Sequence, residues 1–138
     1  MNQFECLVPI LNVTNFAVSM DYYVNRLGFS KKWDWGDPPT FGGVCSGACE
    51  IFLCEDGQGG RGKRPLPAME GFEGSPDAEQ GVWMSIWVDD VDTVYAHCLA
   101  QGIEVTWPPT DEPWGVREMH VRHPDGHVFR ISKGLEED

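Results

Sequence analysis

Basic residues are scarce in this sequence. Only 10 Lys and Arg accompany 22 Asp and Glu among 138 residues, which gives a formal net charge of −12. Nucleic acids and anionic membrane surfaces attract proteins through Lys and Arg side chains, so we expect neither as a partner. The same acidity favours solubility and raises the local concentration of cationic ligands.

Long apolar runs are also missing. No run approaches the roughly 18 residues that span a bilayer, and the N-terminal residues MNQFECLVPILNV lack the basic segment of a secretory signal. Cysteines are few and odd in number, without CxxC spacing: Cys6, Cys45, Cys49, Cys54 and Cys98. This pattern is typical of reduced thiols that act as packing residues, so the sequence predicts a cytoplasmic protein.

Recognisable catalytic motifs are absent as well. The sequence has no nucleophile elbow and no Ser-His-Asp ordering. The glycine-rich residues 57–63 (GQGGRGK) lack the strand-to-helix context of a phosphate-binding loop and are typical of a flexible linker. No catalytic residue is therefore identified from motifs.

What the sequence does contain is enough apolar material for one compact domain, with 41% hydrophobic and 12% aromatic residues. It also contains a weak internal repeat. In the first half, Val13 ends an expected strand, Asn15 can cap a helix, and Gly28 ends that helix before a strand over residues 29–35. Amide or carboxylate caps and a following Gly satisfy the free backbone groups at helix ends.

The second half repeats this order. Val88 ends a strand, Asp89 or Asp90 caps a helix over residues 91–100, and Gly102 ends it before a strand over residues 103–107. The two segments have nearly the same length from the strand-end Val to the helix-end Gly. The sequence therefore predicts two related modules.

Each helix is followed by a predicted hairpin. The first spans residues 41–54 with a turn at Ser46-Gly47, and the second spans residues 114–132 with a turn at His123-Pro124-Asp125-Gly126. Pairing Arg122 with Val128 sets the second register, because opposed residues share a face. One face is then apolar and suited to pack under a helix: Met119, Val121, Phe129 and Ile131. The other face contains Glu118, His120, Arg122, Val128, Arg130 and Ser132, and it faces either solvent or a pocket.

The strand over residues 81–88 alternates in the same way. Met84, Ile86 and Val88 share one side, and Trp83, Ser85 and Trp87 share the other. Large aromatic side chains on an exposed face mark either a binding surface or a dimer interface, and both alternatives stay open.

Three stretches resemble one known family. VPILNVTNFAVSMDYYVNRLGF, GVWMSIWVDDVDTVYAHCLAQGI and PTDEPWGVREMHVRHPDGHVFRI are similar, in this order, to the vicinal-oxygen-chelate superfamily of glyoxalases, bleomycin-resistance proteins and extradiol dioxygenases. Trp83, Trp87 and the PWG-x-RE run resemble the bleomycin-resistance branch. The resemblance implies an α+β fold in which two βαβββ modules form a cupped mixed sheet with helices on the convex face.

The resemblance also sets the expected domain organisation and partners. It implies a single domain over residues 1–138, with module 1 at 4–55, a connecting loop at 56–80 and module 2 at 81–133. It further implies a homodimer, and closed two-fold pairs are the commonest oligomers.

Enzymes of this superfamily bind a divalent metal through His and Glu side chains on equivalent strands. Carried over by position, the four ligand sites fall at Val8, Ile51, Trp83 and Arg130, none of which is a ligand for a hard divalent cation. A one-residue slip would place Glu50 at the second site, but one carboxylate is not a metal site. His120 is expected on the face opposite His123 and His127, so these histidines do not form a ligand cluster either.

We therefore expect no metal and no cofactor, and a protein that sequesters an aromatic or cationic antibiotic-like compound. The candidate ligand-binding residues are Trp35, Trp83, Ser85, Trp87, Trp114, Glu118, His120, Arg122 and Arg130. Indole faces attract cations, whereas Arg122 and Arg130 suit a carboxylate or phosphate, so the charge of the ligand stays open. The alternatives are a metal-dependent lyase, isomerase or dioxygenase of the same superfamily, and an interaction module whose tryptophans form only a dimer interface.

Overall fold

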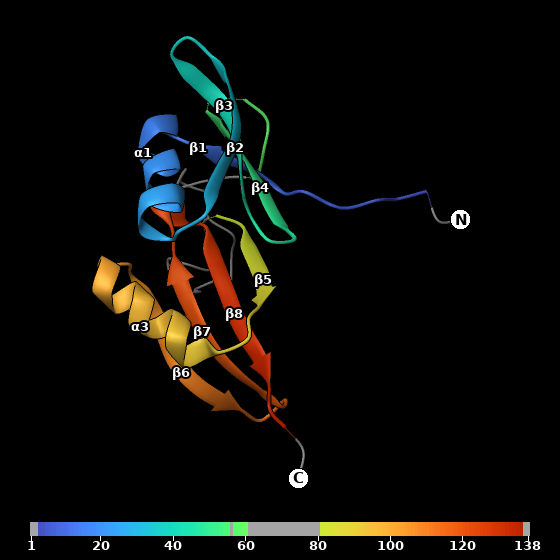
Figure 1. The fold of residues 1–138 in the computed structure, drawn as a ribbon, viewed down its shortest axis with the longest axis vertical. Helices are drawn as coiled ribbons and strands as arrows, with labels where there is room; N and C mark the ends of the chain where they lie inside the picture. The colour runs from blue at the N-terminus through green and yellow to red at the C-terminus, as the bar shows by residue number, and fades with distance from the viewer. Residues whose placement is uncertain (1–2, 56, 61–80, 137–138) are drawn as a thin grey trace, which may run out of the picture. The chain divides into compact units, whose positions relative to one another are not determined.

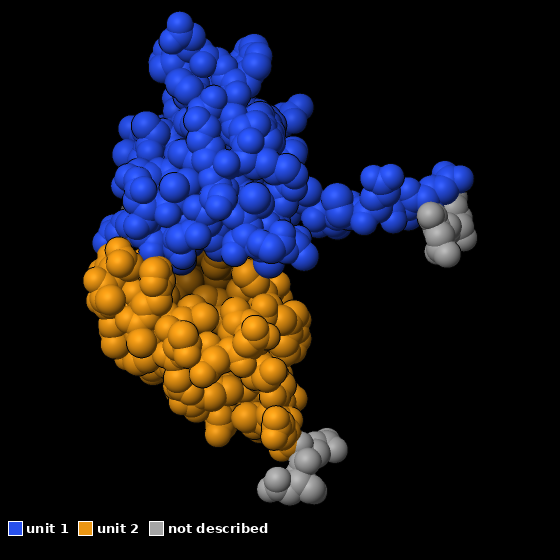
Figure 2. Space-filling view, in the orientation of Figure 1, with its two compact units in different colours: residues 1–61 blue, residues 62–138 orange. Residues whose placement is uncertain are grey.

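The computed structural model describes residues 3–55, 57–60 and 81–136. The chain divides into two compact units, Met1–Arg61 and Gly62–Asp138, shown in blue and orange in Figure 2. Within the described ranges, each unit contains one strand, a helical segment and three further strands, which confirms the α+β class and the two βαβββ modules. Apart from residues 57–60, the expected connecting loop lies outside the described residues.

Unit 1 is a four-stranded mixed sheet with a helical segment on one face (Figure 1). Its elements are β1 (Ile10–Val13), α1 (Phe16–Asp21), the π-helical turn η1 (Tyr22–Arg26), β2 (Ser30–Gly36), β3 (Pro39–Ser46) and β4 (Cys49–Glu55). The strand order is β1-β4-β3-β2, and β1 runs parallel to β4.

Unit 2 repeats this arrangement (Figure 1). Its elements are β5 (Trp83–Trp87), α3 (Val91–Gln101), β6 (Val105–Glu112), β7 (Val116–Arg122), the 3-10 turn η2 (Pro124–Gly126) and β8 (Val128–Gly134). The strand order is β5-β8-β7-β6, and β5 runs parallel to β8.

The predicted helix ends are confirmed. The Asn15 side chain accepts a hydrogen bond from Val18 N at 3.1 Å, and Asp90 rather than Asp89 caps α3 by accepting from Asp92 N at 3.0 Å. Gly102 ends α3 in the left-handed conformation, at φ 65°, which glycine adopts without steric cost. In unit 1 the helix changes instead to π-helical geometry over η1 before Gly28.

The predicted register of the last hairpin is also confirmed, from Arg122↔Val128 to Glu118↔Ser132. Strand lengths are less accurate. β6 continues to Glu112, five residues beyond its predicted end at Trp107, and β7 begins at Val116 rather than Trp114.

In each unit the helical segment covers one face of its sheet and closes an apolar core. The buried apolar side chains on these covered sheet faces are Leu11, Val13, Val44, Ile51 and Leu53 in unit 1, and Met119, Val121, Phe129 and Ile131 in unit 2. All five cysteines are free thiols, but only Cys54 and Cys98 are buried. Cys6 is exposed, so the expectation that every cysteine is a packing residue is wrong there. None of the helices in the described ranges is long and apolar enough to cross a membrane.

Candidate functional site

The candidate site lies on the face of the unit 2 sheet opposite α3. Partnered residues of neighbouring strands share a face, and β5 pairs with β8 as Trp83↔Val128, Ser85↔Arg130 and Trp87↔Ser132. We call this surface the indole face, because it includes four tryptophans that are 44–64% exposed. Its residues are Trp83, Ser85 and Trp87 of β5, Trp107 of β6, Trp114 of the β6–β7 connection, Glu118, His120 and Arg122 of β7, and Arg130 of β8.

Glu118 lies at the centre of this face, and its side chain is only 5% exposed. Trp114 Nε1 donates a hydrogen bond to Oε1 at 3.2 Å, and His120 Nε2 lies 2.7 Å from Oε2. Arg130 Nε pairs with Oε1 at 3.0 Å as an ion pair, without the alignment of a hydrogen bond. The carboxylate thus joins three of the predicted site residues.

The pKa of Glu118 reflects two opposing effects. Burial raises it, because a low-dielectric site disfavours the charged form. The contacts of His120, Arg130 and Trp114 outweigh burial, so the pKa lies below the usual glutamate value. Because an ionised carboxylate can only accept, His120 must present an N–H at Nε2.

The ring of His120 extends this cluster to two tryptophans. It meets Trp83 edge to face at a centroid distance of 5.1 Å and lies over Trp107 at 6.3 Å with an interplanar angle of 28°. Trp107 Nε1 in turn donates to Glu112 Oε1 at 3.0 Å. The predicted site did not include Trp107 or Glu112.

Two prolines explain the omission. Pro108 and Pro109 follow Trp107 directly and read as the end of a strand, because proline cannot donate to a sheet ladder. The register between β6 and β7 shifts between Trp107 and Thr110, which accommodates the prolines and lets the strand continue. The sequence placed Trp107 in the strand that follows Gly102. Its contact with His120, however, depends on the register between β6 and β7, which the sequence did not predict.

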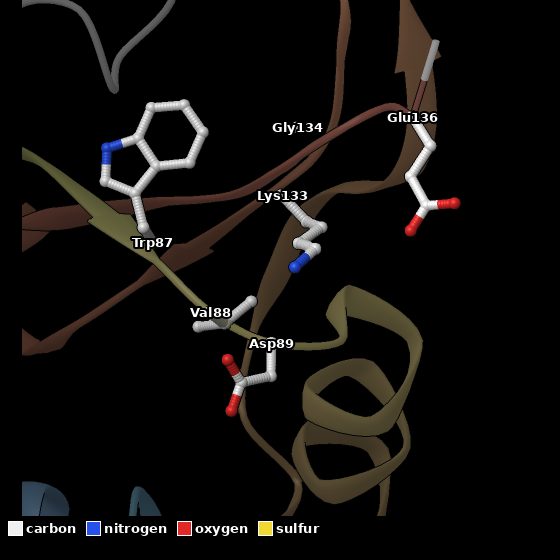
Figure 3. A pocket seen from close by; sticks show the side chains of 6 residues that line it. All are labelled: Trp87, Val88, Asp89, Lys133, Gly134 and Glu136. Carbon is white, nitrogen blue, oxygen red and sulfur yellow. The ribbon is translucent and has the colours of Figure 1, made fainter. Parts of the chain in front are cut away.

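Four predicted site residues lie outside the Glu118 cluster. Ser85 of β5 lies on the indole face beside Arg130, its partner in the sheet. Arg122 is at the end of β7, where its Nη2 pairs with Glu104 Oε2 at 2.6 Å. Trp35 belongs to β2 of unit 1 and is 72% exposed. Trp87 borders a separate hollow of about 430 Å³ at the ends of β5 and β8, lined by Trp87, Val88, Asp89, Lys133, Gly134 and Glu136 (Figure 3). Of the residues of the indole face, only Trp87 lines this hollow.

The corresponding face of unit 1 has an aromatic cluster that was not predicted. Trp33 and Phe41 stack at a centroid distance of 5.0 Å, and Phe52 meets Trp33 edge to face at 5.0 Å. Gly43 makes room for the indole, because a Cβ there would lie 2.6 Å from Trp33 Nε1. This cluster is apolar and has no counterpart of Glu118.

The structure corrects one position in the expected metal-ligand set. Val13 and Val88 each precede a helix cap by two residues, so Ile10 corresponds to Ser85, and their partners Phe52 and Arg130 correspond to each other. Ile51 is wrong for this position, because side chains alternate along β4 and Ile51 points into the core beneath α1.

The side chains at the four positions of the expected ligand set do not suit a divalent metal in either unit. Val8 lies outside β1, Phe52 and Trp83 offer no donor for a hard cation, and the Arg130 guanidinium is itself a cation paired with Glu118. Glu50, which a one-residue slip would place at the second ligand position, is already paired with Lys32 Nζ at 2.6 Å. Within the described ranges, no three His, Cys, Asp or Glu residues are grouped so that they could hold a metal ion.

The two histidines that flank the turn of the last hairpin are structural. His123 and His127 are buried on the helix-covered side of the last hairpin, away from His120, as predicted. His123 packs edge to face on Phe129 at 4.2 Å, and His127 Nδ1 accepts a hydrogen bond from Val82 N at 2.9 Å. Burial, with a smaller effect of His127, lowers the pKa of His123 to about 3.

Comparison with known proteins gives a consistent result. Residues 5–131 match the family model described as the Glyoxalase/Bleomycin resistance protein/Dioxygenase superfamily. No curated protein matches the sequence significantly.

Solved structures share the fold at low sequence identity. The chain is similar to TioX from Micromonospora sp. ML1, with 22% identity, a TM-score of 0.73, and coverage of 96% of this chain and 100% of TioX. TnmS3, an antibiotic binding protein from Streptomyces sp. CB03234, has 20% identity and a TM-score of 0.66, with 97% and 98% of the two chains covered. The bleomycin-binding protein of Streptomyces verticillus, solved with copper(II)-bleomycin, has 21% identity and a TM-score of 0.66, with 99% and 100% covered.

Proposed function

The chain belongs to the Glyoxalase/Bleomycin resistance protein/Dioxygenase superfamily, and from this premise we propose that it is a binding protein that sequesters a small aromatic, antibiotic-like compound. The observation that carries the proposal is the indole face. It has four partly exposed tryptophans, and Trp83 and Trp107 share the His120 ring as a neighbour. Indoles offer flat apolar surfaces that stack on rings and attract cations.

Two of the similar structures support the ligand class. One is an antibiotic binding protein and another is a bleomycin-binding protein in complex with copper(II)-bleomycin. Because these proteins share the fold of this chain at about a fifth sequence identity, they support binding of a compound of that kind but do not identify it.

We also propose that binding needs no metal. The support is the donor chemistry of the indole face, where the one buried carboxylate is already paired with a guanidinium. A cation brought to Glu118 would compete with Arg130 for the same oxygen. The metal-dependent lyases, isomerases and dioxygenases of the superfamily are therefore the competing assignment.

A ligand titration tests the binding function. Intrinsic tryptophan fluorescence of the full chain is measured against a panel of aromatic natural products that includes copper(II)-bleomycin. We expect at least one compound to quench the fluorescence saturably, because four indoles lie on the candidate surface. A panel that leaves the fluorescence unchanged, together with no heat of binding in calorimetry, would contradict the proposal.

Elemental analysis separates the two assignments. We expect dialysed protein to contain no stoichiometric Zn, Ni, Fe or Mn, and ligand binding to be unaffected by a chelator. One metal per chain that survives dialysis, or an activity lost on chelation, would favour the metal-dependent enzyme instead.

A further inference from the structure

Three side chains of the protein contact the carboxylate of Glu118. Trp114 belongs to the β6–β7 connection, His120 to β7 and Arg130 to β8, so three segments meet at one side chain that is 5% exposed. A buried carboxylate is costly unless it is paired and hydrogen-bonded, and here it is both. A ligand on the indole face therefore meets the rings around Glu118 rather than the carboxylate.

We propose that Glu118 is a positioning residue of the indole face, which sets the orientation of Trp114, His120 and Arg130 and does not contact the ligand. This inference rests on the proposed binding function. It differs from the role expected from the sequence, in which Glu118 was a direct ligand contact.

The effect of Glu118 reaches further through His120. With its Nε2 bound to Oε2, the imidazole is fixed in the plane that places it edge to face with Trp83 and over Trp107. An indole held in one orientation loses less conformational freedom when a ligand stacks on it, so the bound geometry is prepared in advance. The lowered pKa of Glu118 is consistent with this arrangement, since the charged form attracts all three donors.

Glu112 provides a matched comparison on the same sheet. Its Oε1 accepts from Trp107 Nε1 at 3.0 Å, and this is an exposed hydrogen bond between two side chains of β6. Glu112→Gln retains an acceptor oxygen and should change little. Glu118→Gln removes the charge that pairs with Arg130, and its single remaining oxygen accepts from Trp114 only as a neutral group, so the contacts of Trp114 and Arg130 are weakened.

The first test uses the ligand-free full chain. Indole Nε1–H signals are observed by ¹H–¹⁵N NMR, and the Trp114 signal is assigned from its absence in Trp114→Phe. In Glu118→Gln we expect the Trp114 Nε1–H to exchange with solvent roughly threefold to tenfold faster, because its acceptor is then neutral and the hydrogen bond is weaker. In Glu112→Gln the Trp114 signal should be unchanged. An unchanged Trp114 signal in folded Glu118→Gln would overturn the proposal.

The second test separates positioning from direct contact. Three fluorescent probes of different charge are titrated: N-phenyl-1-naphthylamine (neutral), thioflavin T (cationic) and 1-anilinonaphthalene-8-sulfonate (anionic). Positioning predicts that Glu118→Gln weakens every probe that binds by a similar factor, roughly threefold to tenfold for the loss of the carboxylate charge that orients the three side chains. Selective loss of thioflavin T would show direct contact between Glu118 and a cation and would overturn the proposal.

Two further outcomes need separate interpretation: a variant that does not fold, and a natural protein that binds no compound. If Glu118→Gln fails to fold, Trp114→Phe removes the same hydrogen bond from the donor side and should weaken the probes equally; unchanged affinities would then refute positioning. If the natural protein binds none of the probes and no compound of the natural-product panel, the proposed function fails. The NMR comparison still tests whether Glu118 orients Trp114, because it needs no ligand.

Discussion

Trp83 and Met119 lie on opposite faces of the unit 2 sheet and have different energetic roles. Trp83 is partly exposed and contacts the His120 ring, whereas Met119 is fully buried between the sheet and α3. An exposed indole contributes little to folding, since much of its surface stays in water. A buried methionine contributes through the apolar area that it removes from water.

We expect substitutions at these two residues to affect different properties. Trp83→Ala should weaken ligand binding by roughly 1–3 kcal/mol, as for loss of an aromatic anchor, with little change in the melting temperature. Met119→Ala should lower the free energy of unfolding by roughly 2–5 kcal/mol through the cavity it leaves. Thermal melts and titrations with a compound from the panel measure both. If Trp83→Ala unfolds the protein while Met119→Ala is silent, the two faces have been assigned in reverse.

At the scale of elements, the hairpin of β7 and β8 joins the site to the core. One face contributes Glu118, His120 and Arg130 to the indole face, and the other contributes apolar side chains to the core beneath α3. At the turn end, His123 and His127 are buried with the core. Because burial disfavours the protonated form of a histidine, the stability of the protein should depend on pH.

The sign of that dependence follows from His123. Its folded pKa of about 3 lies below the ordinary histidine value of 6.5, so the unfolded chain binds the proton more readily. Stability is therefore full above about pH 6.5 and falls as the pH drops toward 3. From pH 7 to pH 5 we expect a loss of about 2 kcal/mol in the free energy of unfolding, measured by urea denaturation. His123→Gln should flatten this slope, and an equal slope in the variant would assign it to other groups.

At the scale of the whole molecule, we propose a homodimer. The family resemblance implies one, and Phe4 and Leu7 leave large apolar side chains 85% and 87% exposed in a single chain. Burial of such side chains in a partner would be favourable.

Light scattering at micromolar concentration measures the oligomeric state. We expect twice the chain mass of 15.5 kDa. The double variant F4S/L7S should shift the equilibrium toward the monomer without lowering the melting temperature of the monomer. A monomeric natural protein would contradict the proposal. Loss of dimer in Trp83→Ala, with no ligand found, would instead favour the reading of the tryptophans as an interface.

The sequence by itself determined the local organisation of this protein. Helix caps at Asn15 and Asp90, the glycine after α3 and the turn before β8 are short-range features, and each follows from the conformations that those residues prefer. The register of the last hairpin followed from its turn, so the division of β5, β7 and β8 into two faces was predictable.

Only the tertiary structure decided which side chains meet on those faces. The contact between Trp107 and His120 depends on a register shift at the two prolines after Trp107, which the sequence does not predict. The side of the sheet on which Ile51 lies depends on the pairing of β4 with β1 and β3. The contacts of Glu118 join three segments, and the length and direction of each side chain decide them. Alternation along a strand fixes a face, but distances between side chains arise only once the strands are paired and twisted.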